Sequence, residues 1–195
     1  MSMKNVFTVD NATMLLIDHQ VGTMGWVGSI SFDEMKKHAL MLAKTAKATN
    51  MPVVLTSSME DQAQGPLLPE LQTILPQAFE NRILRAGIVN AMNDVNFANA
   101  VKATGRKKVI VAGVTNDVCT VYPVLTLLEQ GYEVQVVADA GGSPSKFADE
   151  MSLIRMREAG AIITSTNQLI AELAQDWSSE NGSKLLGVIV ESFQS

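Results

Sequence analysis

Short apolar segments alternate with longer amphipathic segments along this chain. Each short segment is rich in Val, Ile or Leu, which is typical of strands that are buried on both faces of a parallel sheet. Six strands are predicted in this way, at residues 13–17, 52–56, 82–84, 108–112, 133–138 and 161–164.

The amphipathic segments carry the start and stop signals of helices. Ser31 and Glu34 have the spacing of a capping box, and Gly105, Gly131 and Gly160 stand where helices end. Helices are expected at residues 31–50, 94–104, 117–130, 145–159 and 166–177. The repeated βαβ pattern predicts a single-domain, doubly wound, three-layer α/β/α fold with a six-stranded parallel sheet in the order 3-2-1-4-5-6.

Residues 178–195 follow this predicted domain, which spans residues 1–177. The segment begins polar, as SSENGS, and finishes apolar, as KLLGVIVESF. An apolar tail after a completed sheet indicates either a last packed helix or a contact with a neighbouring subunit. We favour the subunit contact.

Composition narrows the possible partners. The chain has 195 residues, of which 47% are hydrophobic and 18% are charged, and its net charge is −5. A weakly acidic protein has no electrostatic reason to bind nucleic acid or an anionic membrane. No segment is apolar over the ~18 residues that a membrane span needs, and the N-terminus lacks a signal-peptide core, so a cytoplasmic protein is expected. The low charge favours a homo-oligomer that binds a small-molecule substrate.

The chain has one cysteine, Cys119, which follows the fourth predicted strand. Ligand sites in doubly wound sheets lie at the carboxyl ends of strands one and four, where the strand order reverses. The first turn of the following helix would lower the pKa of a thiol and offer N–H groups to an oxyanion. A lone cysteine is also commonly a small buried hydrophobe, so both roles remain open.

Asp18 and Arg85 end the first and third predicted strands. A carboxylate at the end of a buried strand is costly unless it is paired, solvated or used, so Asp18 is either a base or a structural cap or ion pair. Arg85 is either a surface charge or a fixed cation that holds Asp18 ionised or binds a carboxylate or carbonyl oxygen. By position alone, the substrate pocket is expected to contain Gln20, Trp26, Asn90 and Tyr122.

Several other chemistries lack their motifs. The residue six positions after Cys119 is Leu125, so the phosphate loop of a tyrosine phosphatase is absent, and Asp18 is not part of a phosphatase DxD pair. The sequence has no CxxC pair, no GxGxxG, no GxxxxGK[ST] and no GxSxG. Its two histidines, His19 and His38, fall in no ligand cluster. We therefore expect no cofactor and no metal.

Four segments together resemble the isochorismatase-like cysteine hydrolases, and within them the YcaC-like group. They are LLIDHQ (15–20), RAGIVNAM (85–92), GVTNDVC (113–119) and GYEVQVVADAGGS (131–143). The resemblance implies an Asp–Lys–Cys triad in which Asp18 and Cys119 match and Arg85 stands where most of the superfamily has lysine. It also implies octamers. Members that are nicotinamidases carry an Asp/His metal site after the second strand, and residues 57–66 contain no histidine, so that activity is disfavoured.

The same resemblance implies a cis peptide bond between Val114 and Thr115, and an oxyanion hole formed by the N–H groups of Thr115 and Cys119. The implied function is a cysteine hydrolase that acts on a small amide-like substrate through a thioester intermediate. Cleavage of a vinyl ether, as in a true isochorismatase, is a lesser possibility. A catalytically idle binder of small molecules or a redox-sensing thiol on the same fold is the alternative.

Overall fold

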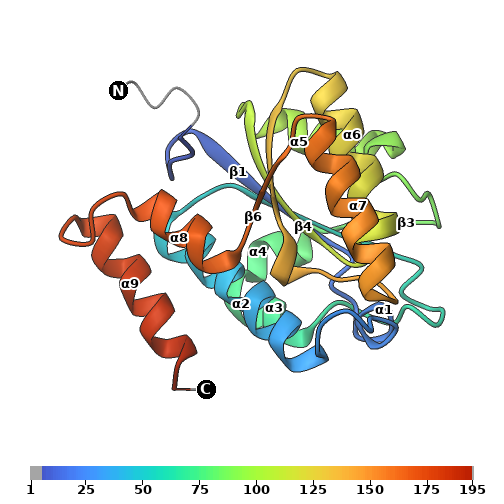
Figure 1. Ribbon diagram of the computed structural model, residues 1–195, viewed down its shortest axis with the longest axis horizontal. Coiled ribbons are helices and arrows are strands. Elements are labelled where there is room, and N and C mark those ends of the chain that lie inside the picture. Colours follow the sequence, from blue (N-terminus) through green and yellow to red (C-terminus); the bar gives the residue numbers. More distant parts are fainter. Residues whose placement is uncertain (1–5, 195) are drawn as a thin grey trace.

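The computed structural model describes residues 6–194, and its centre is a parallel sheet (Figure 1). The sheet has six strands in the order β3-β2-β1-β4-β5-β6, so the doubly wound order predicted from the sequence is confirmed. The strands are β1 (Ala12–Ile17), β2 (Val53–Ser58), β3 (Ile83–Arg85), β4 (Lys108–Gly113), β5 (Glu133–Val137) and β6 (Ile162–Thr164). β1 pairs with both β2 and β4, which puts the reversal of strand order beside it.

Helices cover both faces of the sheet because successive side chains of each strand point to opposite faces. Met14 and Leu16 of β1 belong to one hydrophobic core, and Leu15 and Ile17 belong to the other. The first core is covered by α2 (Phe32–Thr49), α3 (Pro69–Ile74), α4 (Pro76–Glu80), α8 (Thr166–Ala174) and α9 (Glu180–Ser192). The second is covered by α5 (Val95–Ala103), α6 (Val121–Glu129) and α7 (Lys146–Glu158).

Short helical elements connect the strands to these layers. They are α1 (Val21–Gly25), η1 (Ala91–Asn93), η2 (Asn116–Thr120) and η3 (Ala138–Ala140). The sequence analysis does not anticipate α1, η1 and η3, nor α3 and α4, because one or two turns are too short to show a helical period. It expects one helix over residues 117–130, where the structure has the π-helical turn η2 followed by α6 from Val121. It does place the starts of the long helices, where the side chains of Ser31, Asp94, Ser145 and Ser165 accept hydrogen bonds from the first-turn N–H groups.

The C-terminal segment forms helix α9, which lies against α2 and α8 (Figure 1). Leu185, Val188 and Ile189 are buried in this contact. Leu186 and Phe193 on its other side are exposed, at 42% and 73% of their surface. The segment is thus a packed helix that, among residues 6–194, also presents exposed apolar side chains. The favoured subunit contact stays a prediction.

Among residues 6–194, no helix has both the length and the apolar character that crossing a membrane requires.

Candidate active site

The carboxyl ends of three strands bring Asp18, Arg85 and Cys119 together. Asp18 follows β1 directly, Arg85 is the last residue of β3, and Cys119 lies in η2, shortly after β4. In a parallel sheet these ends share one edge, and β1 and β4 flank the reversal of strand order. Residues that are far apart in the sequence therefore meet where doubly wound folds bind their ligands.

The Asp18–Arg85 pair is buried, with each side chain only 1% exposed. The Nη2 atom of Arg85 donates to both carboxylate oxygens of Asp18, and Nη1 donates to the carbonyl oxygen of Ile88. Its Nε atom donates to Oγ1 of Thr56 over 3.0 Å, and that hydroxyl donates to the carbonyl oxygen of Ile83 over 2.8 Å. A guanidinium is charged at every physiological pH, and because each of its nitrogens has an acceptor, Arg85 is held in one place.

Asp18 occupies the left-handed region of backbone space, with φ at 57°, as the chain leaves β1. Asp tolerates this conformation better than most residues. Its N–H still donates to the carbonyl oxygen of Thr56 over 3.0 Å, which holds the turn against β2. Burial raises the pKa of the Asp18 carboxyl, while Arg85 and a hydrogen bond with Cys119 act to lower it. The carboxylate is therefore more basic than a solvated one.

Cys119 lies in a five-residue π-helical turn that precedes α6. The N–H of Thr120 donates to the carbonyl oxygen of Thr115 over 3.0 Å, which closes this wide turn. Burial and the neighbouring Asp18 carboxylate raise the pKa of the thiol to about 12, and Arg85 and the Thr115 backbone oppose them less strongly. The expected lowering of this pKa by a helix N-terminus is wrong, because desolvation outweighs the partial charge of the helix end.

The thiol forms part of the wall of a cavity of about 290 Å³. Its lining comprises Asp18, Gln20, Thr23, Trp26, Ser58, Met59, Gln64, Arg85, Gly87, Ile88, Val89, Thr115, Val118, Cys119 and Pro144. All three candidate catalytic side chains and two of the four expected pocket residues, Gln20 and Trp26, therefore surround one space. The peptide bond between Val114 and Thr115 is cis, and Thr115 borders this cavity.

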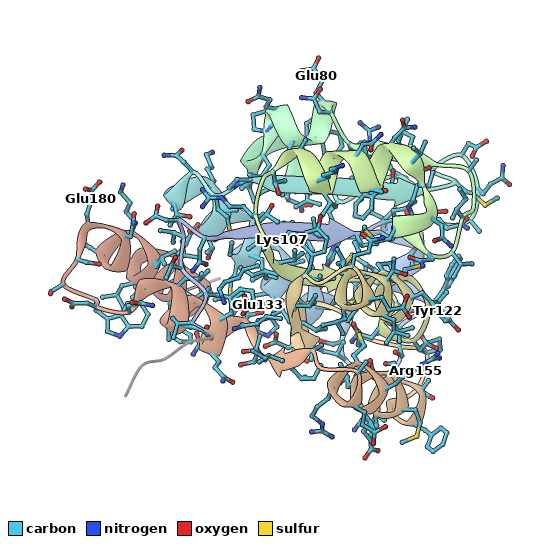
Figure 2. All side chains as sticks on the ribbon, turned by 90° about the horizontal axis from the view of Figure 1, so that it is seen from above. Glu80, Lys107, Tyr122, Glu133, Arg155 and Glu180 are labelled. Carbon is cyan, nitrogen blue, oxygen red and sulfur yellow. The ribbon has the colours of Figure 1, made fainter. Side chains whose placement is uncertain are left out.

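The other two expected pocket residues, Asn90 and Tyr122, do not line this cavity. The side chain of Asn90 accepts from the N–H of Met92 at the start of η1 and donates to Oγ1 of Thr126 over 2.9 Å. Tyr122 lies on α6 and points toward Arg155 of α7, whose guanidinium carbon is 5.5 Å from the centre of its ring (Figure 2). Both side chains are thus engaged elsewhere.

The comparison with protein families decides the family. The model of the isochorismatase domain matches residues 12–168, which is most of the chain. The chain belongs to the isochorismatase family. It is 39% identical over 168 residues to "Probable hydrolase YcaC" of Escherichia coli, covering 86% of this chain and 80% of that protein. The resemblance found in the sequence is therefore confirmed.

Solved structures agree with this family. YcaC from Pseudomonas aeruginosa superposes with a TM-score of 0.89 at 37% identity, covering 100% of both chains. YcaC from E. coli superposes with a TM-score of 0.91 at 35% identity, covering 100% of this chain and 95% of that one. The latter is described as an octameric hydrolase of unknown specificity, so this isochorismatase-family chain is similar to hydrolases on both measures.

One supporting residue of this isochorismatase-family site, Thr56, escapes sequence reasoning, whereas Gln20 is expected in the pocket. Thr56 bridges β3 and the Arg85 guanidinium, and only its position between neighbouring strands reveals that role. Gln20 donates to the carbonyl oxygens of Ser58 and Gly65 and accepts from the N–H of Ser58 over 2.8 Å. The Gln20 amide therefore ties the segment after β2 to the start of α1 and forms a fixed part of the cavity wall.

His19, beside Asp18 in the sequence, is fully buried and hydrogen-bonded through Nε2 to the carbonyl oxygen of Ala140 over 2.8 Å. A carbonyl only accepts, so Nε2 carries the proton of a neutral ring. Burial lowers the pKa of His19 to about 4 from the usual 6.5. His19 therefore has a structural role, in which it ties the end of β1 to η3.

Acidification is expected to destabilise the protein through His19. Between the usual pKa of 6.5 and about 4, the unfolded chain binds a proton on His19 that the folded chain does not. Stability is therefore complete above pH 6.5 and falls as the pH drops, by about 3 kcal/mol in total from this group. Urea unfolding at several pH values should show that the free energy of unfolding falls less steeply with decreasing pH in His19→Gln than in the parent protein. His38→Gln, which changes a part-exposed histidine, should keep the full loss, and equal pH slopes in all three proteins would contradict the prediction.

Proposed function

We propose that this chain is a cysteine hydrolase in which Cys119 is the nucleophile, Asp18 is its base and Arg85 holds Asp18 in place. One observation carries the proposal. The buried Asp18 carboxylate is hydrogen-bonded to Arg85, and it lines one cavity of about 290 Å³ together with Cys119, whose thiol pKa it raises. A nucleophile, an adjacent base and a group that orients the base are the parts that covalent catalysis needs.

The reaction starts from a protonated thiol, since the pKa of Cys119 is about 12. As Sγ attacks the carbonyl carbon of an amide, the proton passes from Sγ to the Asp18 carboxylate. The negative charge that develops on the carbonyl oxygen is held by the N–H groups of Thr115 and Cys119. The C–N bond then breaks, the leaving nitrogen takes the proton from Asp18, and a thioester remains on Cys119.

Water completes the cycle. Asp18 accepts a proton from the attacking water, the C–S bond of the thioester breaks, and the thiol regains the proton. The net reaction consumes one water and releases a carboxylic acid and an amine or ammonia. Arg85 gives up no proton in these steps, because a guanidinium stays charged at every physiological pH. Its role is to keep the carboxylate aimed at the sulfur.

Relatives support covalent chemistry and assembly. The structure of the P. aeruginosa YcaC is described with a covalent acrylamide, and that of the E. coli YcaC as an octamer. By analogy, we propose that this chain also forms a homo-oligomer, with an octamer as the expected state. The uncovered apolar side of α9, with Leu186 and Phe193, is a suitable contact surface. The cytoplasmic location stays a prediction.

The pH dependence of alkylation tests the activated nucleophile. The chain has one cysteine, so iodoacetamide labels one site and the intact mass reports its rate. If Asp18 takes the proton, the rate is nearly constant with pH once Asp18 is ionised. If only the rare free thiolate reacts, the rate rises by about tenfold per pH unit up to the thiol pKa.

We expect an alkylation rate that is nearly independent of pH. We also expect a thioester adduct on Cys119 when the reaction with a hydrolysed amide is stopped with acid. A tenfold rise per pH unit together with no adduct would instead favour a catalytically idle binder. A redox-sensing role is disfavoured by a thiol pKa of about 12, since sensor cysteines have low pKa values and accessible thiolates. Sulfenic acid formation under mild peroxide, without hydrolysis of any amide, would support that role.

A further inference from the structure

We infer that the cavity beside Cys119 takes uncharged ligands, so that the substrate is a small neutral amide with an apolar acyl group. This inference rests on the proposed function for the reaction and on the cavity wall for the substrate class. The wall combines a cation whose charge is balanced by Asp18, a largely apolar surface and a small volume.

The first argument concerns charge. Asp18 and Arg85 are the charged side chains of the lining, and they neutralise each other. Every guanidinium nitrogen of Arg85 already has an acceptor, namely Asp18, Thr56 or the carbonyl oxygen of Ile88. A carboxylate on the substrate would lose its hydration and meet only an arginine whose charge Asp18 already balances, which is unfavourable. Isochorismate-like dianions are therefore poor candidates for this cavity.

The second argument concerns the rest of the wall. Trp26, Met59, Ile88, Val89 and Val118 line the cavity and remain between 38% and 50% exposed. Apolar side chains exposed around a polar reaction centre indicate that a ligand's apolar part covers them. The amide end of the substrate would face Cys119, and its hydrocarbon part would contact this apolar rim.

The third argument concerns size and product release. A volume of about 290 Å³ lies at the small end of the roughly 300–1,000 Å³ that is typical of ligand pockets, so the ligand is small. Hydrolysis turns the neutral amide into a carboxylic acid that ionises at neutral pH. The same absence of a free cation that excludes anionic substrates thus favours departure of the anionic product.

Isocaproamide and succinamate form a matched test pair, because they differ only at the far end, where an isopropyl group replaces a carboxylate. The expected kcat/KM of the parent protein is at least about 100-fold higher for isocaproamide. Cys119→Ala, studied by calorimetry, is expected to bind isocaproamide in preference to succinamate. This binding measurement does not depend on any reaction at the cysteine.

Adding a cation to the rim tests the charge argument directly. Val89→Lys places an ammonium on the cavity wall at a half-exposed position and is expected to narrow the preference for isocaproamide by at least about tenfold. Val95→Lys is the matched control, since Val95 is 68% exposed and lies outside the cavity. It should leave the preference unchanged.

The outcomes separate this inference from the proposed function. Equal handling of both compounds by the parent protein, binding of neither by Cys119→Ala, or an unchanged preference in folded Val89→Lys would overturn the neutral-ligand inference. Selective binding of isocaproamide by Cys119→Ala, with no hydrolysis by the parent protein, would support the inference and refute the hydrolase proposal.

Discussion

Asp18→Asn is expected to slow amide hydrolysis by about 10²–10⁴-fold, the usual contribution of a general base. At the same time the thiol should become more acidic, because the Asp18 carboxylate is one of the causes that raise the pKa of Cys119 to about 12. The variant would thus hold more thiolate and yet turn over more slowly. This combination separates proton transfer during attack from the mere presence of a thiolate.

The measurement is the pH profile of Cys119 alkylation beside kcat for one hydrolysed amide. In Asp18→Asn the profile should change from flat to a rise of about tenfold per pH unit that levels off below the parent thiol pKa. Asp61→Asn, which alters an exposed carboxylate near β2, should match the parent protein in both assays. Retained turnover in a folded Asp18→Asn would remove Asp18 from the mechanism.

Arg85→Met is expected to destabilise the fold by about 3–5 kcal/mol, because it leaves the Asp18 carboxylate buried without its partner. The methionine also lacks the hydrogen bonds that Arg85 donates to Thr56 and to the carbonyl oxygen of Ile88. Urea unfolding near pH 7 gives the free energy, and the double variant Arg85→Met with Asp18→Asn should recover part of the loss, since no buried charge then remains unpaired.

Arg82→Met serves as the comparison for this loss. Arg82 also pairs with a carboxylate, Glu60, but both side chains are 22% exposed, so the expected cost is about 1 kcal/mol or less. If Arg82→Met and Arg85→Met lose equal amounts of unfolding free energy, the buried pair contributes no more to stability than the exposed pair, and the prediction is contradicted.

The sequence predicts the sheet well because its strands are buried on both faces. Segments such as residues 108–112 are apolar at nearly every position, and this pattern depends on few distant contacts. Helix starts are equally local, since Ser31 and Asp94 satisfy N–H groups only two or three residues away. Helices α3 and α4 escape prediction because two short turns that begin at Pro69 and Pro76 leave no measurable period.

Position in the sequence predicts only some of the residues that line the cavity. Asn90 and Tyr122 stand in segments near the site, but a side chain's partner depends on which helix packs beside it. Asn90 bonds to Thr126 of α6, and Tyr122 meets Arg155 of α7. No sequence motif marks Thr56 or Val89 as site residues. The packing of neighbouring strands and loops places Thr56 beside Arg85 and Val89 in the cavity wall.

The sequence by itself predicted the strand order, because that follows from local pattern and parallel topology. Its resemblance to a family grouped Asp18, Arg85 and Cys119, which the structure places at one edge of the sheet. The tertiary structure alone decided the charge state of the site. The packing made Arg85 the buried partner of Asp18, and burial raised the pKa of the Cys119 thiol instead of lowering it. Desolvation depends on what surrounds a group in space, and no spacing along the chain records that.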